Sequence, residues 1–338
     1  MDVRDAIARL VEGASLAEGE MEEVITRLMR GDATPAQIGG LLVALRMKGE
    51  TVDEITGAAR TMRANAVRAH PRAEIIVDTC GTGGDASGTF NVSTAAAFIA
   101  AGAGITVAKH GNRAMSGRVG GADVLETLGV RIDLAASAVV ACIDEVGIGF
   151  LFAQTFHPAM KHAALPRREL GVRTLFNLIG PLSNPAGARR QVVGVFASKW
   201  TEVLAHALCR LGSEHAVVVS GVDGLDEISL SDVTHVSELR NGEVRSYEIT
   251  PEQFGFRRCR MVDLKGGDRE QAARHVRDVL EGTADTDRTA FALLNAAAAI
   301  YVGGGAESIA DGLVKARESI RSGGAARKLA ALVELSNR

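Results

Sequence analysis

The chain has 338 residues, 46% hydrophobic and 23% charged, which is enough apolar material to bury a large core. Its formal net charge is −3, from 38 basic and 41 acidic residues, so it lacks the overall positive field that attracts a nucleic-acid backbone or an anionic membrane. No stretch approaches about 18 uncharged apolar residues, and the first residues alternate charged with apolar side chains, which argues against a transmembrane helix or a secretory signal. We therefore expect a globular protein that binds neither nucleic acid nor membrane.

The cysteines indicate a reducing compartment. Cys80, Cys142, Cys209 and Cys259 lie far apart in the sequence, without the paired spacing of a metal site or the density of a disulfide framework. Reduced structural thiols are therefore the favoured interpretation, and such thiols are typical of cytosolic proteins. The sequence predicts a cytoplasmic location.

The first 70 residues show helix signals only. Three candidate capping boxes follow one another, SLAE at 15–18, TPAQ at 34–37 and TVDE at 51–54. In each, the first side chain can accept from the N3 amide while the Glu or Gln reaches back to the N-cap. Between the last two boxes, apolar residues recur at helical spacing at Ile38, Leu41, Leu42 and Leu45. Residues 1–70 are therefore expected to form a small all-helical domain.

From residue 71 onward, short apolar runs alternate with helical stretches. The expected strands are residues 75–77, 105–108, 191–196 and 216–220, and the expected helices are residues 92–103, 122–128 and 290–302, the last apolar on all sides and so buried. This rhythm predicts parallel strands with crossover helices. The expected fold class is α/β, with a larger, mainly parallel-sheet domain over residues 71–338. Within it, residues 157–185 are less regular, a helical stretch followed by a turn-rich segment.

A glycine-rich loop follows the first expected strand. Residues 78–94 read DTCGTGGDASGTFNVST and lead into a helix, so backbone amides and a helix N-terminus can face an anion. The glycine spacing nearly fits a dinucleotide fingerprint and a P-loop, but the acidic ribose ligand of the first and the lysine of the second are missing. Because Asn91, Ser93 and Thr94 add further donors, the loop favours phosphate binding over a purely structural turn.

A basic loop follows the second expected strand. Residues 109–118 read KHGNRAMSGR, in which Lys109, Arg113 and Arg118 can neutralise phosphates. Because one crossover helix joins the two strands, both loops should emerge at the same carboxyl edge of the sheet, where open α/β sheets bind ligands. His110 has no second histidine at ligand spacing, so a structural role is favoured over a general base or a metal ligand.

A pair of carboxylates follows another apolar strand. Asp226 and Glu227 end the run DGLDE at 223–227, which a short connection joins to the expected strand at residues 216–220. Adjacent carboxylates near phosphates repel unless a cation lies between them, and Mg²⁺ takes oxygen ligands from carboxylates and substrate phosphates together. Acidic pairs are common on surfaces, but next to the two loops this pair predicts a magnesium site.

Six motifs stand in a recognisable order along the chain. They are GTGGD at 81–85, NVST at 91–94, KHGNR at 109–113, GGADVLETLG at 120–129, RRELGVRTLFNLIGPLSNP at 167–185 and DGLDE at 223–227. With these motifs, collinear from about residue 15 to the last helices, the chain resembles the anthranilate phosphoribosyltransferases, whose fold is shared with pyrimidine nucleoside phosphorylases. The resemblance implies transfer of the 5-phosphoribosyl group of phosphoribosyl pyrophosphate (PRPP) to the amino group of anthranilate in tryptophan biosynthesis. It also implies Mg²⁺, with two ions, and a homodimer formed through the helical domain.

The resemblance also assigns roles to individual residues. Lys109, Asp226 and Glu227 are expected to position and neutralise charge, and no residue is identified as a nucleophile or base. The implied Mg²⁺ ligands are Ser93, Asp226 and Glu227, and the implied anthranilate contacts are Gly81, Asn112 and Arg167. The residues implied to bind PRPP are Gly81, Gly84, Asp85, Thr89, Asn91, Val92, Ser93, Thr94, Lys109, His110, Gly111, Asn112, Arg113, Ala114, Met115, Ser116, Gly117 and Gly121.

One residue departs from the family pattern, since Gly121 stands where many relatives have a serine and only its backbone can contribute. The resemblance further implies that the segment 157–185 joins the helical domain in space and that anthranilate binds between the domains. Two rival functions are a pyrimidine nucleoside phosphorylase-like enzyme and a noncatalytic nucleic-acid-binding relative of the same fold. The first should lack the KHGNR and DGLDE motifs together, and the second should have lost the substrate motifs.

Overall fold

A computed structural model describes residues 1–83, 87–114 and 119–338. The expected PRPP-binding residues Gly84, Asp85, Met115, Ser116 and Gly117 lie outside these ranges, as does Arg118. Among the described residues, no helix combines the length and apolar character that a membrane span requires.

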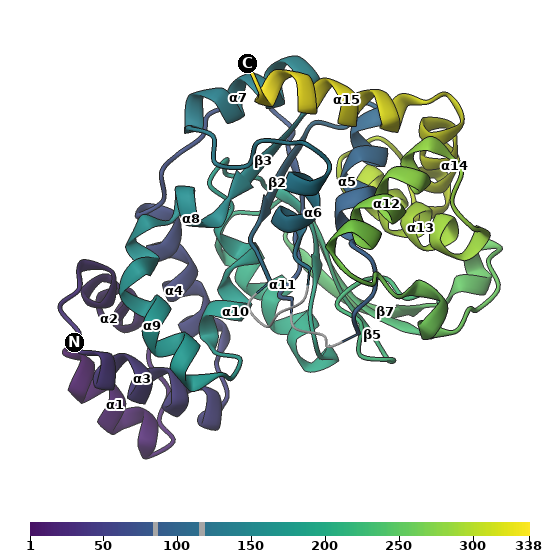
Figure 1. The fold of residues 1–338 in the computed structure, drawn as a ribbon. Helices are drawn as coiled ribbons and strands as arrows, with labels where there is room; N and C mark the ends of the chain where they lie inside the picture. Colours follow the sequence, from purple (N-terminus) through teal and green to yellow (C-terminus); the bar gives the residue numbers. More distant parts are fainter. Residues whose placement is uncertain (84–86, 115–118) are drawn as a thin grey trace.

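A bundle of helices forms one end of the molecule (Figure 1). Its N-terminal members are α1 (Val3–Val11), α2 (Glu18–Arg30), α3 (Pro35–Lys48) and α4 (Val52–Ala64). After α8 (Ala153–Phe156), two later helices pack against them, α9 (Lys161–Leu170) on α2 and α3, and α10 (Leu175–Ile179) on α4. The expected apolar stripe of α3 is buried in the core of this bundle, which confirms the prediction from its spacing.

The larger domain is built on one seven-stranded sheet with the order β3-β2-β1-β4-β5-β6-β7. The strands are β1 (Val77–Thr79), β2 (Val107–Gly111), β3 (Ile148–Phe152), β4 (Arg190–Gly194), β5 (His215–Gly221), β6 (Thr234–Arg240) and β7 (Glu243–Ile249). The strands from β3 to β5 are parallel, and β6 and β7 add an antiparallel hairpin at one edge. The expected α/β class is therefore confirmed. The strand order reverses between β1 and β4, the kind of switch point at which open α/β sheets bind ligands.

Helices cover both faces of this sheet. Along β5, Val217 and Val219 belong to the same core as α5 (Val92–Gly102) and α13 (Thr286–Val302), whereas Ala216 and Val218 belong to the core that contains α11 (Thr201–Arg210). Further helices of this domain are α6 (Gly121–Thr127), α7 (Ala136–Val146), α12 (Arg269–Glu281), α14 (Ile309–Arg321) and α15 (Gly324–Ser336). Helix α13 is buried throughout residues 290–302, as its apolar sequence predicts.

The first of the three expected capping boxes is wrong. Helix α2 begins at Glu18, so Ser15 does not cap it. The residue after Ser15, Leu16, is buried, and its N–H donates to Oε1 of Glu54 at 3.0 Å, which holds the chain in an extended path before the helix. The other two boxes are confirmed, since each N-cap hydroxyl accepts from the N3 amide.

The first strand begins later than its apolar run suggests. It begins at Val77, and the side chain of Ile75 is 44% exposed. The strand continues into Asp78, whose buried carboxylate accepts from Nδ2 of Asn184 at 2.8 Å and from the backbone N–H of His110 at 3.0 Å. Hydrogen bonds of this kind let a carboxylate occupy a buried strand position that hydrophobicity does not mark.

Candidate active site

Three loops leave the sheet at the carboxyl edge of the parallel strands. They follow β1, β2 and β5, which run in the same direction. The parallel pairing of β1 with β2 confirms that the glycine-rich loop and the basic loop leave the same edge. Because β1 and β4 flank the switch point, all three loops surround the place where such a sheet binds ligands.

The glycine-rich loop is fastened to β4. The N–H of Cys80 donates to the carbonyl of Val192 at 3.2 Å, and the N–H of Thr82 donates to the carbonyl of Gly194 at 2.8 Å. Gly194 has no room for a side chain, because a Cβ there would lie 1.5 Å from the carbonyl oxygen of Asp226. The loop that carries Asp226 is therefore packed directly on β4, next to the glycine-rich loop.

Asp226 contacts the glycine-rich loop through its side chain. Its Oδ2 accepts from the N–H of Gly83 at 2.8 Å, and a Cβ on Gly81 would approach the same oxygen to 2.8 Å. The carboxylate thus lies among amides of the kind that bind phosphate. Its negative charge opposes a phosphate in that place unless a cation is shared between the two.

The expected metal ligands present oxygen atoms to one small region. Ser93, in the first turn of α5, lines a small pocket together with Glu227 and Gly81. Asp226 adjoins this pocket through its contact with Gly81. One hydroxyl and two carboxylates are the hard oxygen donors that Mg²⁺ prefers, so these residues fit a magnesium ion.

Asp223, the other carboxylate of the DGLDE motif, has a different role. It accepts from the backbone N–H of Leu225 at 3.3 Å and from the hydroxyls of Ser229 and Ser231. These contacts close the turn after β5. Within one motif, the structure therefore separates a carboxylate that shapes the loop from the pair next to the glycine-rich loop.

Lys109 is a buried cation in the same region. Its Nζ donates to the carbonyl oxygen of Thr79 and reaches Oγ of Ser93 at 3.3 Å and Oγ1 of Thr79 at 3.4 Å, all neutral oxygens. Among the described residues, no carboxylate forms an ion pair with Nζ, and burying a cation in this way costs roughly several kcal/mol even when hydrogen bonds remain. A bound phosphate would supply negative charge next to the ammonium.

The NVST segment joins the glycine-rich loop to the basic loop. Nδ2 of Asn91 donates to the carbonyl of Val119 at 3.1 Å, and its Oδ1 accepts from the hydroxyl of Thr94 at 3.1 Å. Gly121 faces these side chains, since a Cβ there would lie 3.4 Å from both Oδ1 of Asn91 and Oγ1 of Thr94. Val92 points into the core instead, so only its backbone can contact a ligand.

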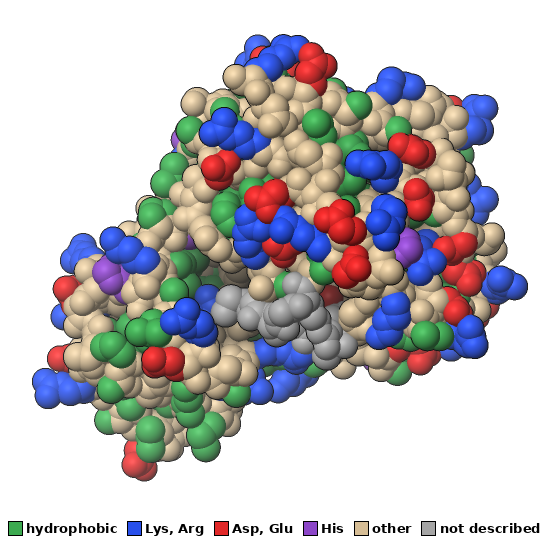
Figure 2. Space-filling model, viewed as in Figure 1, with side chains coloured by type: hydrophobic (Ala, Val, Ile, Leu, Met, Phe, Trp, Pro, Cys, Tyr) green, Lys and Arg blue, Asp and Glu red, His purple; other side chains and the backbone are tan. Residues whose placement is uncertain are grey.

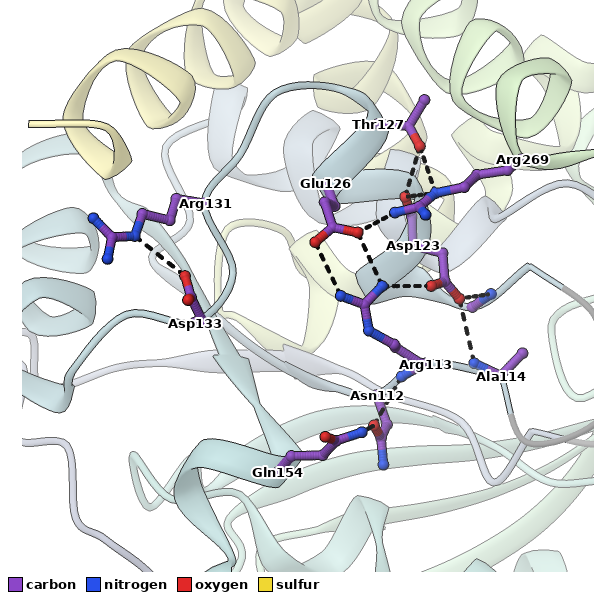
Figure 3. A network of polar contacts seen from close by, with 11 residues as sticks. Asn112, Arg113, Ala114, Asp123, Glu126, Thr127, Arg131, Asp133, Gln154 and Arg269 are labelled. Carbon is purple, nitrogen blue, oxygen red and sulfur yellow. Dashed lines mark hydrogen bonds and ion pairs between the residues drawn. The ribbon is translucent and has the colours of Figure 1, made fainter.

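Arg113 is already paired with carboxylates (Figure 3). Its guanidinium donates to Asp123 at 2.8 Å and to Glu126 at 2.9 and 3.0 Å, and Arg269 of α12 also pairs with Glu126. These hydrogen bonds raise the pKa of Arg113 and lower that of Glu126 to about 2. The sequence suggested that Arg113 neutralises phosphate, but in the structure its charge is balanced by α6 and it anchors the basic loop there.

Arg167 is a half-buried cation in α9. Its guanidinium carbon lies 5.2 Å from the ring centroid of Phe176, and burial lowers its pKa to about 10. Loss of water is the one cause of this shift, which means that no carboxylate of the described chain offsets it. Among the described residues, no hydrogen bond joins Arg167 to Gly81 or Asn112, the other expected anthranilate contacts; Asn112 instead accepts from Gln154 at 3.4 Å.

Asn295 is a residue of this site that was not predicted. It lies in the buried helix α13, where its Oδ1 accepts from the N–H of Ile228 and its Nδ2 donates to the carbonyl of Ile228, both at 3.0 Å. Ile228 directly follows Glu227, and Asn295 lines the same small pocket as Glu227 and Ser93. A single amide within an otherwise apolar helix is the sequence signal that marks it.

We expect Asn295→Ala to raise the Mg²⁺ concentration required for half-maximal rate. Both backbone groups of Ile228 would lose their partner, at about 1 kcal/mol each, and the neighbouring carboxylates would no longer be held in place, so the shift should be about tenfold. Mg²⁺ titrations at saturating substrate measure it. Ser319→Ala is the matched control, because Ser319 is equally buried and donates to the carbonyl of Ile99 away from the metal loop. A similar Mg²⁺ shift in both variants would mean that Asn295 acts on stability alone.

Buried titratable groups lie on the other face of β1 and β2. The rings of His110 and His157 lie 5.1 Å apart between centroids. Burial lowers the pKa of His110 to about 3 and that of His157 to about 4, because an imidazolium is poorly solvated there. Burial also raises the pKa of Asp78 to about 6, although its hydrogen bonds act in the opposite direction.

Metal-free protein should lose stability between about pH 6.5 and pH 4.5. The unfolded chain protonates both histidines in this range, while the folded chain keeps them neutral. The contribution of each histidine to the free energy of unfolding is therefore complete above about pH 6.5 and falls by about 2 to 3 kcal/mol as the pH is lowered to about 4.5. Asp78 offsets part of this loss, because its raised folded pKa makes protonation favourable to the native state. Urea unfolding at pH 7 and pH 4.5 measures the difference. His157→Asn should reduce it, whereas replacing the exposed His206 by Ala should not.

Family models and relatives support the geometric picture. The helical bundle domain of a glycosyl transferase family matches residues 4–66, and the a/b domain of a glycosyl transferase family matches residues 73–326. The anthranilate phosphoribosyltransferase of Anaeromyxobacter sp. (strain K) is 55% identical over 331 residues, which cover 98% of each chain. That of Thioalkalivibrio sulfidiphilus is 54% identical and covers 99% of each.

Solved structures give the same result. Anthranilate phosphoribosyltransferase from Thermus thermophilus matches with a TM-score of 0.94 and 43% identity, over 99% of this chain and 100% of that one. The Saccharomyces cerevisiae enzyme in complex with PRPP and Mg matches with a TM-score of 0.89 and 27% identity, over 99% of this chain and 98% of that one. With more than half of its sequence identical to named members over nearly its full length, the chain belongs to the anthranilate phosphoribosyltransferase family.

Proposed function

We propose that this chain is a Mg²⁺-dependent anthranilate phosphoribosyltransferase of tryptophan biosynthesis. It joins the 5-phosphoribosyl group of PRPP to the amino group of anthranilate and releases N-(5-phosphoribosyl)anthranilate and pyrophosphate. The observation that carries this proposal is the arrangement of the glycine-rich loop, Lys109 and Asp226 at one edge of the sheet. The identity to anthranilate phosphoribosyltransferases supports the choice of acceptor, and the yeast complex with PRPP and Mg supports the donor and the metal.

The reaction requires charge control more than a general base. The amino nitrogen of anthranilate is uncharged at neutral pH and already nucleophilic, so the C1′–N bond forms as the C1′–O bond to pyrophosphate breaks. The nitrogen then releases one proton to solvent. Lys109 and the backbone amides of the glycine-rich loop stabilise the negative charge that gathers on pyrophosphate through an oxocarbenium-like transition state. When bound, Mg²⁺ supplies further Lewis-acid neutralisation of the same leaving group.

The expected binding residues divide this work. Ser93, Asp226 and Glu227 would hold the metal, and their oxygen donors support Mg²⁺ as its identity. We propose that two ions bind. Arg167 would pair with the carboxylate of anthranilate, because a guanidinium that is desolvated without an ion-pair partner favours an anion. Thr89, whose hydroxyl lies 3.2 Å from that of Ser87 in the glycine-rich loop, remains proposed as a PRPP contact.

The direct test mixes the purified chain with PRPP, Mg²⁺ and anthranilate and follows the loss of anthranilate fluorescence. We expect turnover that requires all three components, with one pyrophosphate released per anthranilate consumed. If anthranilate is not consumed while a pyrimidine nucleoside is cleaved by inorganic phosphate, the nucleoside phosphorylase-like alternative replaces this proposal.

The helical end of the molecule is proposed to form a homodimer interface. Val11 and Met47, at the ends of α1 and α3, are 69% and 83% exposed, and Figure 2 shows hydrophobic side chains gathered at this end. Apolar surface of this kind favours association. Light scattering should give twice the monomer mass, and a monomer mass would contradict the proposal.

A cytoplasmic location is also proposed, supported by four free thiols in the described chain.

A further inference from the structure

Asp78, Cys80 and His110 form a cluster behind the PRPP-binding edge. A carboxylate oxygen, the Cys80 Sγ and a ring nitrogen of His110 all lie within 4.8 Å of one another. Asp78 and His110 are 0% and 4% exposed, and Cys80 is partly exposed. The spacing of histidines in the sequence did not indicate this site, because the other two donors are not histidines. Asp78 lies in β1 and Cys80 directly follows it, and the pairing of β1 with β2 brings both close to His110.

The burial of His110 is not explained by its hydrogen bonds. The backbone of Gly180 contacts the ring and favours its charged form, but the contact falls short of hydrogen-bond geometry, so neither ring nitrogen is paired with any described residue. The neighbouring ring of His157 also has a buried Nε2 without such a partner. Buried polar atoms are nearly always paired, so an imidazole with two unpaired ring nitrogens next to a thiol and a carboxylate points to a ligand that accepts its lone pair.

We propose that Asp78, Cys80 and His110 bind a borderline-soft divalent metal, Zn²⁺ by preference, through ligands other than those of Mg²⁺, although Cys80 also borders the pocket of Ser93 and Glu227. One sulfur, one nitrogen and one oxygen donor match Zn²⁺, whereas Mg²⁺ takes oxygen ligands. Zn²⁺ bonds of about 2.0 to 2.3 Å place tetrahedral ligands about 3.3 to 3.8 Å apart, so any donor pair near the 4.8 Å limit must move closer when the metal binds. Binding releases the thiol proton of Cys80 to solvent and leaves a fourth position for water.

The position of the cluster gives this site a consequence for the enzyme. Cys80 directly precedes Gly81, and His110 directly precedes Gly111, so its ligands lie at the starts of both phosphate-facing loops. Contraction around a metal would displace the backbone of both loops. Zn²⁺ should therefore slow turnover even when Mg²⁺ is in excess.

Cobalt is a direct probe of the proposed site. The full chain is first freed of transition metals and kept in excess Mg²⁺. It should then bind one Co²⁺ and show a thiolate-to-metal charge-transfer band that Zn²⁺ abolishes. Cys80→Ser should lose this band. Cys209→Ser is the matched control, since Cys209 is also partly exposed and its Sγ contacts the carbonyl of Gly242 far along the chain from β1. Absence of the band in the unsubstituted chain, or a band that survives Cys80→Ser, overturns the proposal.

A second measurement requires no substitution and so does not depend on how a variant folds. Alkylation of the unmodified chain by iodoacetamide, followed by peptide mapping, reports each thiol separately. Zn²⁺ should slow alkylation of Cys80 by about tenfold or more, because a metal-bound thiolate is shielded from the reagent, and should leave Cys209 unchanged. Equal Cys80 rates with and without Zn²⁺ would also overturn the proposal.

Discussion

Asp226→Asn and Glu227→Gln should each raise the Mg²⁺ concentration for half-maximal rate by about tenfold or more, because a unit charge at contact distance contributes about 1 to 4 kcal/mol near a protein surface. Each substitution removes that charge while keeping an oxygen atom. Asparagine at 226 can still accept from the N–H of Gly83, so the loop contact at 2.8 Å does not have to be lost. Initial rates at saturating anthranilate and PRPP, with Mg²⁺ varied, give the required concentration.

The control for this experiment comes from the same motif. Asp223→Asn also removes one negative charge from the DGLDE run, but Asp223 binds the hydroxyls of Ser229 and Ser231 and shapes the turn. It should lower the melting temperature and leave the Mg²⁺ requirement unchanged. If Asp223→Asn shifts the Mg²⁺ requirement as far as Asp226→Asn does, the effect is a general loss of negative charge, and the assignment of Asp226 as a ligand fails.

The fold class was predictable because its signals are local. Capping boxes and apolar runs of strand length depend on neighbours in the sequence, and they located α3, α4, β4 and β5 to within a few residues. The hairpin of β6 and β7 was not expected. Strand β7 is mostly exposed and rich in charged residues, so it lacks the hydrophobic alternation that marks a strand, and it exists through pairing with β6 at the edge of the sheet.

The site was predictable as far as its chemistry follows from residue type and strand order. The glycine-rich loop and the carboxylate pair met these conditions. Arg113 did not, because its pairing with Asp123 and Glu126 depends on how α6 packs against the basic loop, and Arg269 reaches the same Glu126 from a distant part of the chain. Asn295 was missed for the same reason, since its contact with Ile228 spans 67 residues. Long-range packing decides which charged side chains remain available to a ligand.

Arg167→Ala should raise the KM for anthranilate by about 10- to 100-fold and change the KM for PRPP by less than about twofold, since a hydrogen-bonded ion pair with a carboxylate contributes about 1.5 to 3 kcal/mol. The guanidinium has lost water on burial and has no ion-pair partner in the described chain, so the anthranilate carboxylate would supply its counter-charge. Steady-state kinetics with each substrate varied at saturation of the other separates the two constants.

Two further variants separate recognition from folding. Arg168→Ala changes the neighbouring, exposed arginine of the same helical turn and should leave both constants unchanged. Arg167→Lys keeps the charge but lacks the planar pair of donors, so its KM for anthranilate should lie between those of the parent and Arg167→Ala. Because Arg167 also stacks on Phe176, the alanine variant will lose some packing, and its melting temperature must be compared with its kinetics. A parallel rise in both KM values, with a lowered melting temperature, would show that Arg167 supports the bundle and does not contact anthranilate.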